Sequence, residues 1–166
     1  MDYQALRQEK DEFFASHLQS PLRDEQKAHF KGLNYFPPNP ALRFELKLMP
    51  FPERKNVEIQ TNTGDVQIYA RLGYFSFEIE GQPVTLTLYG NQYGYFLPFT
   101  DGLAGVETYP AGRYLEPEAL GENTFVVDFN LAYNPYRAYN DDWSCPLTPP
   151  ENRLSVPIRA GEKLFK

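Results

Sequence analysis

The feature that most constrains the fold is a change from helical to alternating patterning after residue 40. Phe44, Leu46 and Leu48 alternate with charged residues, so one side of this segment should face a core and the other side solvent. Further alternating runs follow at residues 57–61, 66–72, 74–79 and 84–89, and each junction between these runs contains a glycine. Because the turns are too short for crossover helices, we expect an antiparallel meander.

The rest of the chain predicts shorter strands and a helical arm. Residues 95–99, 113–115, 124–128 and 156–158 are predicted strands between loops rich in Gly, Pro and Asn. Residues 2–16 have an amphipathic helical pattern, and a second helix is predicted over 21–30, with Ser20 as its cap and Pro21 at its first position. The sequence therefore predicts a mainly β fold in which the meander forms a barrel or a sandwich, with an N-terminal two-helix arm.

Length and charge narrow the class of protein. A chain of 166 residues with 42% hydrophobic residues suits a single domain, residues 1–166, made of a helical arm (1–33) and a β-rich body (41–166). The formal net charge is −6, and no cluster of Lys and Arg stands out against it. Nucleic acid is therefore not an expected partner, because phosphate backbones bind to concentrated positive charge.

Several chemistries and locations lack support in the sequence. The lone cysteine, Cys145, cannot form an internal disulfide, and no apolar run approaches the length of a membrane span, so we expect a cytoplasmic protein with no membrane partner. The two histidines, His17 and His29, have no Cys or His at ligand spacing, so no metal is expected. No glycine-rich phosphate-binding pattern is present, and no cofactor is expected.

Residues 95–153 combine aromatic residues, glycines and a few polar groups, and they form the candidate site. Arg113 follows Gly112 and lies between Tyr109 and Tyr114, so its guanidinium could bind a carboxylate or phosphate between aromatic walls. The alternative is a structural ion pair with an aspartate, Asp101 or Asp128.

Three acidic residues are candidates for acid–base catalysis. Asp128 ends a predicted strand, and alternation places Asn130 on the same side, at a rim where loops often build sites. Asp101 and Glu107 flank a loop that contains glycines and could join Asp128 as paired carboxylates. The alternatives are loop-fixing hydrogen bonds for Asp128 and Asn130, and solvated turn acids for the other two.

The loop at 134–143 is rich in aromatic and amide groups and could stack against a planar ligand or a sugar, or cover one end of the β body. The leading hypothesis is a small-ligand binding protein with an Arg-centred, tyrosine-rich pocket. The predicted binding residues are Tyr109, Arg113, Asn130, Tyr133, Asn134, Tyr139 and Trp143.

Two other functions stay open at this stage. One is a metal-independent hydrolase or lyase that uses the three acids, with Arg113 stabilising developing negative charge. The other is an interaction module that joins a partner, or a second copy of this chain in a homo-oligomer, through the N-terminal helices. That module would expose the apolar stripe of Phe13, Phe14 and Leu18 in the monomer.

The chain also resembles a known family, the bacterial domain-of-unknown-function 1684 (DUF1684) family. The resemblance rests on motifs spread over most of the chain: Leu33-Asn34-Tyr35-Phe36-Pro37, residues 96–101, residues 107–114, residues 128–135, Cys145-Pro146, Pro150-Glu151-Asn152 and Ala160-Gly161-Glu162-Lys163. It implies a β-rich domain and supplies no catalytic assignment. The chain departs from the family pattern at Leu103-Ala104-Gly105, where hydroxyl or amide donors are usual, and at Arg137, where a cysteine is frequent.

Overall fold

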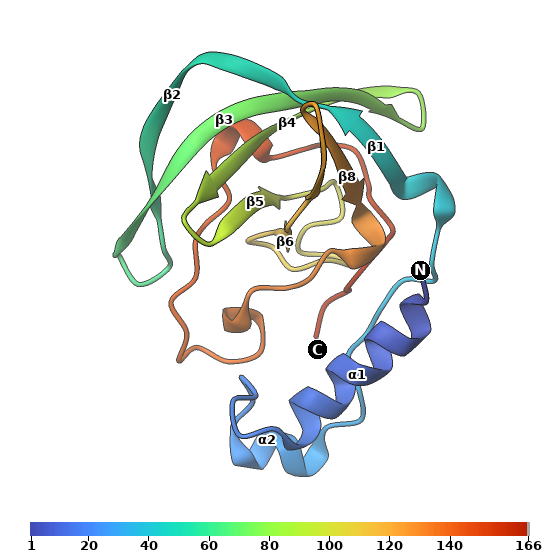
Figure 1. The fold of residues 1–166 in the computed structure, drawn as a ribbon. Coiled ribbons are helices and arrows are strands. Elements are labelled where there is room, and N and C mark those ends of the chain that lie inside the picture. Colours follow the sequence, from blue (N-terminus) through green and yellow to red (C-terminus); the bar gives the residue numbers. More distant parts are fainter. Residues whose placement is uncertain (166) are drawn as a thin grey trace.

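Two antiparallel sheets form the body of the protein in the computed structural model, which describes residues 1–165. One sheet has the strand order β2–β3–β4–β5–β6 and the other has the order β1–β8–β7. The arrangement is sandwich-like, and the long strands β2 and β3 of the five-stranded sheet arch over the rest of the β body (Figure 1). The strands are β1 (Arg43–Lys47), β2 (Met49–Gln60), β3 (Val66–Ile79), β4 (Gln82–Asn91), β5 (Gly94–Phe99), β6 (Arg113–Leu115), β7 (Glu118–Gly121) and β8 (Thr124–Asp128).

The predicted meander is confirmed for β2, β3 and β4, with two differences. Its expected first strand, the run at residues 44–48, forms β1 and pairs with β8 in the smaller sheet, and the second difference lies at Gly73. The two runs at 66–72 and 74–79 form a single strand, β3, whose pairing with β4 shifts between Arg71 and Gly73. A Cβ at Gly73 would lie 2.4 Å from the Met49 carbonyl oxygen, so the glycine permits close approach of β2 instead of ending the strand.

The predicted strand at 156–158 is wrong. Val156 and Ile158 are buried as their apolar character requires, but the segment joins no sheet ladder. Instead the backbone N–H of Ile158 donates to Asp101, and its carbonyl accepts from Arg113. Side chains thus satisfy backbone groups that a neighbouring strand would otherwise pair.

The core divides into three clusters. The largest lies between the two sheets, a second and more aromatic one draws one buried residue from each strand of the five-stranded sheet, and a third joins the helical arm to the body. The central members of the largest cluster are Phe75, Leu86, Leu88, Leu97, Phe99, Val127 and Phe129.

Helix α1 (Tyr3–Ser16) matches its prediction, and Asp2 caps it by accepting from the Ala5 N–H at 3.0 Å. Helix α2 (Asp24–His29) is shorter than the predicted 21–30. Ser20 does not cap it, because the Ser20 hydroxyl donates to the Phe14 carbonyl at 2.7 Å and so fixes the turn after α1. The short 3-10 helices are η1 (Pro40–Leu42), η2 (Phe129–Leu131), η3 (Tyr136–Ala138) and η4 (Pro150–Asn152).

The arm packs against its own body. Phe14 is 2% exposed and lies edge-on to Tyr139, with ring centroids 4.9 Å apart. Phe13 is half-buried, whereas Leu18 is 97% exposed. The expectation that the whole stripe is exposed in the monomer is therefore wrong, since its middle residue belongs to the third core cluster. Over residues 1–165, no helix combines the length and apolarity needed to cross a membrane.

Candidate functional site

Arg113 is sealed within the protein. It lies on β6 and is 1% exposed. Its Nη1 donates to the carbonyls of Ala160 and Glu162, its Nη2 donates to the carbonyl of Ile158 at 3.0 Å, and Asp101 Oδ2 lies 3.8 Å from Nη2. Arg113, which was predicted to anchor a ligand, is thus a buried structural group. It forms the alternative ion pair with Asp101 and binds the C-terminal segment.

Charge pairing keeps this arrangement stable. Burial lowers the pKa of Arg113 to about 10, while Asp101 and Glu162 oppose that shift, so the guanidinium stays charged at neutral pH. Asp101 accepts from Thr108 Oγ1 at 2.7 Å and from the Ile158 N–H at 2.8 Å. Asp101 is therefore occupied by protein donors and is poorly placed to act on a substrate.

Glu162 is a buried carboxylate that the sequence did not single out. It is 1% exposed, and its Oε2 accepts from the Asn134 N–H (2.6 Å) and the Tyr139 hydroxyl (2.8 Å). Its Oε1 lies 2.7 Å from Lys10 Nζ on α1. The one available signal was its place in the Ala160–Lys163 motif, because no local pattern marks this carboxylate as buried.

The aromatic loop at 134–143 holds the arm in place. Asn134 and Tyr139 bind Glu162, and Tyr139 also packs on Phe14. Trp143 Nε1 donates to the Pro21 carbonyl at 3.1 Å. The 134–143 loop was predicted either to stack against a ligand or to cover one end of the β body. Asn134, Tyr139 and Trp143 do cover another part of the protein, but that part is the helical arm. Tyr109 is half-buried and lines none of the cavities described below.

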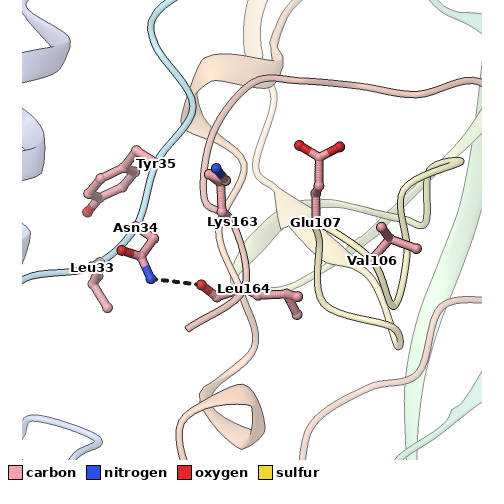
Figure 2. Close-up of a pocket in the computed structure, with 7 residues that line it drawn as sticks. All are labelled: Leu33, Asn34, Tyr35, Val106, Glu107, Lys163 and Leu164. Carbon is pink, nitrogen blue, oxygen red and sulfur yellow. Dashed lines mark hydrogen bonds between the residues drawn. The ribbon is translucent and has the colours of Figure 1, made fainter. Parts of the chain in front are cut away.

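The three candidate acids do not meet. Glu107 Oε2 lies 3.4 Å from Arg159 Nη2. Glu107 also lines an open pocket with Lys163. Figure 2 shows Glu107 on the opposite side of Leu164 from Asn34 and Tyr35. Asp101 is buried beside Arg113. Asp128 is also buried, and its Oδ1 accepts from the backbone N–H and from Nδ2 of Asn130, as in the alternative of loop-fixing hydrogen bonds, although it lines another pocket. The structure therefore does not bring them together as the paired carboxylates that the sequence suggested.

A small, partly open space lies between α1 and the body, and we call it the α1 cavity. Its volume is about 80 Å³. On this measure one water needs about 10–15 Å³, so the α1 cavity has room for a small polar group such as a carboxylate. Its lining residues are Tyr3, Leu6, Arg7, Lys10, Tyr35, Asn130, Leu131, Ala132, Tyr133 and Glu162.

Arg7 differs from Arg113 in leaving a donor free. Its Nη1 donates to the Phe36 carbonyl at 2.9 Å, and its guanidinium carbon lies 4.5 Å from the centroid of the Tyr35 ring. Its Nη2 is buried and has no hydrogen-bond partner among the residues that the structure describes. Burial lowers the pKa of Arg7, and the nearby Tyr35, Tyr3 and Glu162 oppose that shift.

Tyr35 contributes a second free group to the α1 cavity. Its hydroxyl is also buried without a hydrogen-bond partner within residues 1–165, and burial raises its pKa. Lys10 lies across the cavity but is engaged with Glu162. Two hydrogen-bond donors, one of them cationic, thus belong to residues that line one space.

Tyr133 connects the α1 cavity to two further hollows. It also lines a pocket of about 230 Å³ beside Asp128, which we call the acidic pocket, and an open groove of about 560 Å³ beside the β4–β5 hairpin. Its hydroxyl donates to Glu116 Oε1, and Glu116 lines the same two hollows. Of the predicted ligand residues, Asn130 and Tyr133 are the two that line the α1 cavity.

Fold and site together define a β-sandwich domain with a packed helical arm and a cavity beneath that arm. The chain belongs to the family described as "Protein of unknown function (DUF1684)", whose model matches residues 28–163. It is similar to an uncharacterised protein from gene locus rrnAC0354 of Haloarcula marismortui, known from a solution NMR structure. The identity is 37%, the match covers 96% of this chain and 91% of that chain, and the TM-score is 0.72. No curated protein matches the chain.

Proposed function

We propose that this protein binds a small carboxylate-bearing ligand in the α1 cavity, with Arg7 as the anion contact. The observation that supports it is the pair of free donors, Arg7 Nη2 and the Tyr35 hydroxyl, at one cavity. Burying a polar group without a partner costs about 1–3 kcal/mol, so such groups usually have a reason to persist. A ligand with acceptor oxygens supplies the missing partner.

The charges at the α1 cavity favour an anion. Lys10 and Glu162 neutralise each other at 2.7 Å, which leaves the guanidinium of Arg7 as the uncompensated charge. Of the three other buried polar atoms without a hydrogen-bond partner within residues 1–165, Asn134 Oδ1 and Arg137 Nε belong to residues that do not line this cavity. The third, Glu162 Oε1, does belong to a lining residue, but it forms the ion pair with Lys10 Nζ. The ligand-binding hypothesis therefore shifts from Arg113 to Arg7, and Tyr133 and Asn130 remain as predicted wall residues.

Calorimetric titration of acetate, propionate and butyrate into the protein tests this proposal. The wild type should bind at least one of them, and Arg7→Gln should weaken binding roughly 10- to 100-fold, the effect of losing a charge-assisted hydrogen bond. Arg54→Gln removes one positive charge from exposed β2 and should leave binding unchanged. If Arg7→Gln binds as well as wild type, or if no carboxylate binds wild type, the proposal is wrong.

An acid–base reaction at Asp128 is the alternative we retain. Asp128 accepts hydrogen bonds from Tyr3 and Asn130, but unlike Asp101 it lines one of the hollows described above, the acidic pocket next to the α1 cavity. Asp101 and Glu107 would take no part in it, for the reasons given above. We place either activity in the cytoplasm, where the lone Cys145 would remain reduced.

A further inference from the structure

The acidic pocket has the opposite charge to the α1 cavity. Its charged side chains are the carboxylates of Glu116, Glu118 and Asp128 and the guanidinium of Arg43. Met1, which carries the amino group of the chain, lines this pocket as well, so three negative groups share it with two positive groups. In the α1 cavity, by contrast, Arg7 is the charge left without a counter-ion among the described residues. Partly enclosed hollows of opposite sign attract opposite ends of a ligand.

The two hollows adjoin each other. Leu131 and Tyr133 line both of them and form an apolar wall between the charged ends. Asp128 in the acidic pocket accepts from the Tyr3 hydroxyl at 2.5 Å and from Asn130 Nδ2 at 2.9 Å. Both of those donors line the α1 cavity, so direct hydrogen bonds join the two hollows.

From this geometry we infer that the ligand is a small zwitterion, an ω-amino acid or a molecule like it. Its carboxylate binds Arg7 and Tyr35, its ammonium group lies among Asp128, Glu116 and Glu118, and its short apolar stem passes Leu131 and Tyr133. This inference rests on the proposed function, because it uses the same carboxylate contact. It adds the identity of the second charged group.

Other small carboxylates fit this pair of hollows less well. A dicarboxylate would place its second negative charge among three carboxylates, which repel it more than the guanidinium of Arg43 and the amino group of Met1 attract it. A simple alkyl carboxylate would leave the carboxylates of the acidic pocket facing a methyl group. An ammonium group instead supplies three donors to these acceptors.

The experiment compares matched pairs of ligands by calorimetry on the full chain. The amino acids β-alanine, 4-aminobutyrate and 6-aminohexanoate are each titrated beside the alkyl carboxylate of equal carbon number, propionate, butyrate or hexanoate. At least one amino acid should bind wild type about fivefold or more tightly than its counterpart, as expected for an added, partly screened charge contact. Ranking the three lengths then gives the separation of the charged ends.

Two variants assign the ends of the ligand. Glu116→Gln should lower the ratio of the two affinities, amino acid over alkyl carboxylate, towards one. The affinity for the alkyl carboxylate should stay the same. Glu78→Gln, an exposed charge on β3, should change neither value. Arg7→Gln should weaken both members of each pair.

The outcomes separate the two proposals. If alkyl carboxylates bind in an Arg7-dependent way and no amino acid exceeds its counterpart, the zwitterion inference is overturned and the proposed function stands. If the amino acids bind more tightly but Glu116→Gln keeps the full preference, the assignment of the ammonium group to the acidic pocket is overturned. If neither series binds wild type, the proposed function itself fails.

Discussion

Arg113 and Arg7 are the same residue type in two opposite situations. Arg113 donates to three backbone carbonyls and pairs with Asp101, whereas Arg7 donates to one carbonyl and keeps Nη2 free. A buried charge whose partners are all protein groups is part of the architecture. A buried charge with a free donor beside a cavity points instead to a missing partner.

The surrounding elements explain this difference. Arg113 lies on a strand fixed by β5, opposite a C-terminal segment that belongs to no sheet and therefore needs donors for its carbonyls. Arg7 lies on a helix that attaches to the body through a few side chains, among them Tyr3, Lys10 and Phe14. The three predictions below test this contrast.

The largest effect should come from Arg113→Met. The variant leaves Asp101 buried without its counter-ion and removes donors from the carbonyls of the 158–162 segment, so we expect the free energy of unfolding to fall by about 3–5 kcal/mol. Urea denaturation measures it. Arg71→Met is the matched control, because its bidentate partner Glu151 is about one-third exposed, and it should cost about 1 kcal/mol. Equal losses in the two variants would contradict the architectural role of Arg113.

An intermediate effect is expected for Glu162→Gln. The amide oxygen can still accept from Asn134 and Tyr139, but the ion pair with Lys10 is lost, so stability should fall by about 1–3 kcal/mol. Amide hydrogen exchange in α1 should speed up more than exchange in β4. A double-mutant cycle with Lys10→Met isolates the pair, and a coupling energy near zero would show that this pair does not hold the helix.

The smallest effect, and one of opposite sign, is expected for Tyr35→Phe. Removing a buried hydroxyl that has no partner should raise the free energy of unfolding by about 1 kcal/mol in the absence of ligand. Tyr114→Phe is the matched control, because the Tyr114 hydroxyl donates to the Pro146 carbonyl and its removal should lower stability by about 1 kcal/mol. Thermal and urea unfolding measure both variants, and a loss of stability in Tyr35→Phe would argue against a free donor.

Prediction from the sequence worked where the signal was local. Alternation around Phe44–Leu48 correctly marked β1, and short glycine-containing junctions correctly predicted the meander. It failed where a distant group replaced the local partner. Ser20 is of a residue type that often caps helices, but its hydroxyl donates to the Phe14 carbonyl. Ile158 lies in a run typical of a strand, but its backbone N–H donates to the Asp101 carboxylate.

The candidate site shows the same division. Asp128 and Asn130 could be selected from their place at the end of a predicted strand, and Tyr133 from the aromatic character of its segment. All three line the hollows near α1. Arg7 could not, because in the sequence it is one of several charges on an amphipathic helix. Its importance depends on the ring of Tyr35 and the absence of a carboxylate at Nη2, which are properties of packing.

The amino-acid sequence by itself determined the mainly β class, the antiparallel meander of β2, β3 and β4, the position of α1 and the family, because each depends on neighbouring residues or on motifs along the chain. The tertiary structure alone decided which charges are paired and which remain free. That follows from chain topology, since the counter-ions come from distant segments: Glu162 meets Lys10, and Arg113 meets Asp101 and the last residues of the chain. Burial then fixes the cost of leaving any one of them unpaired.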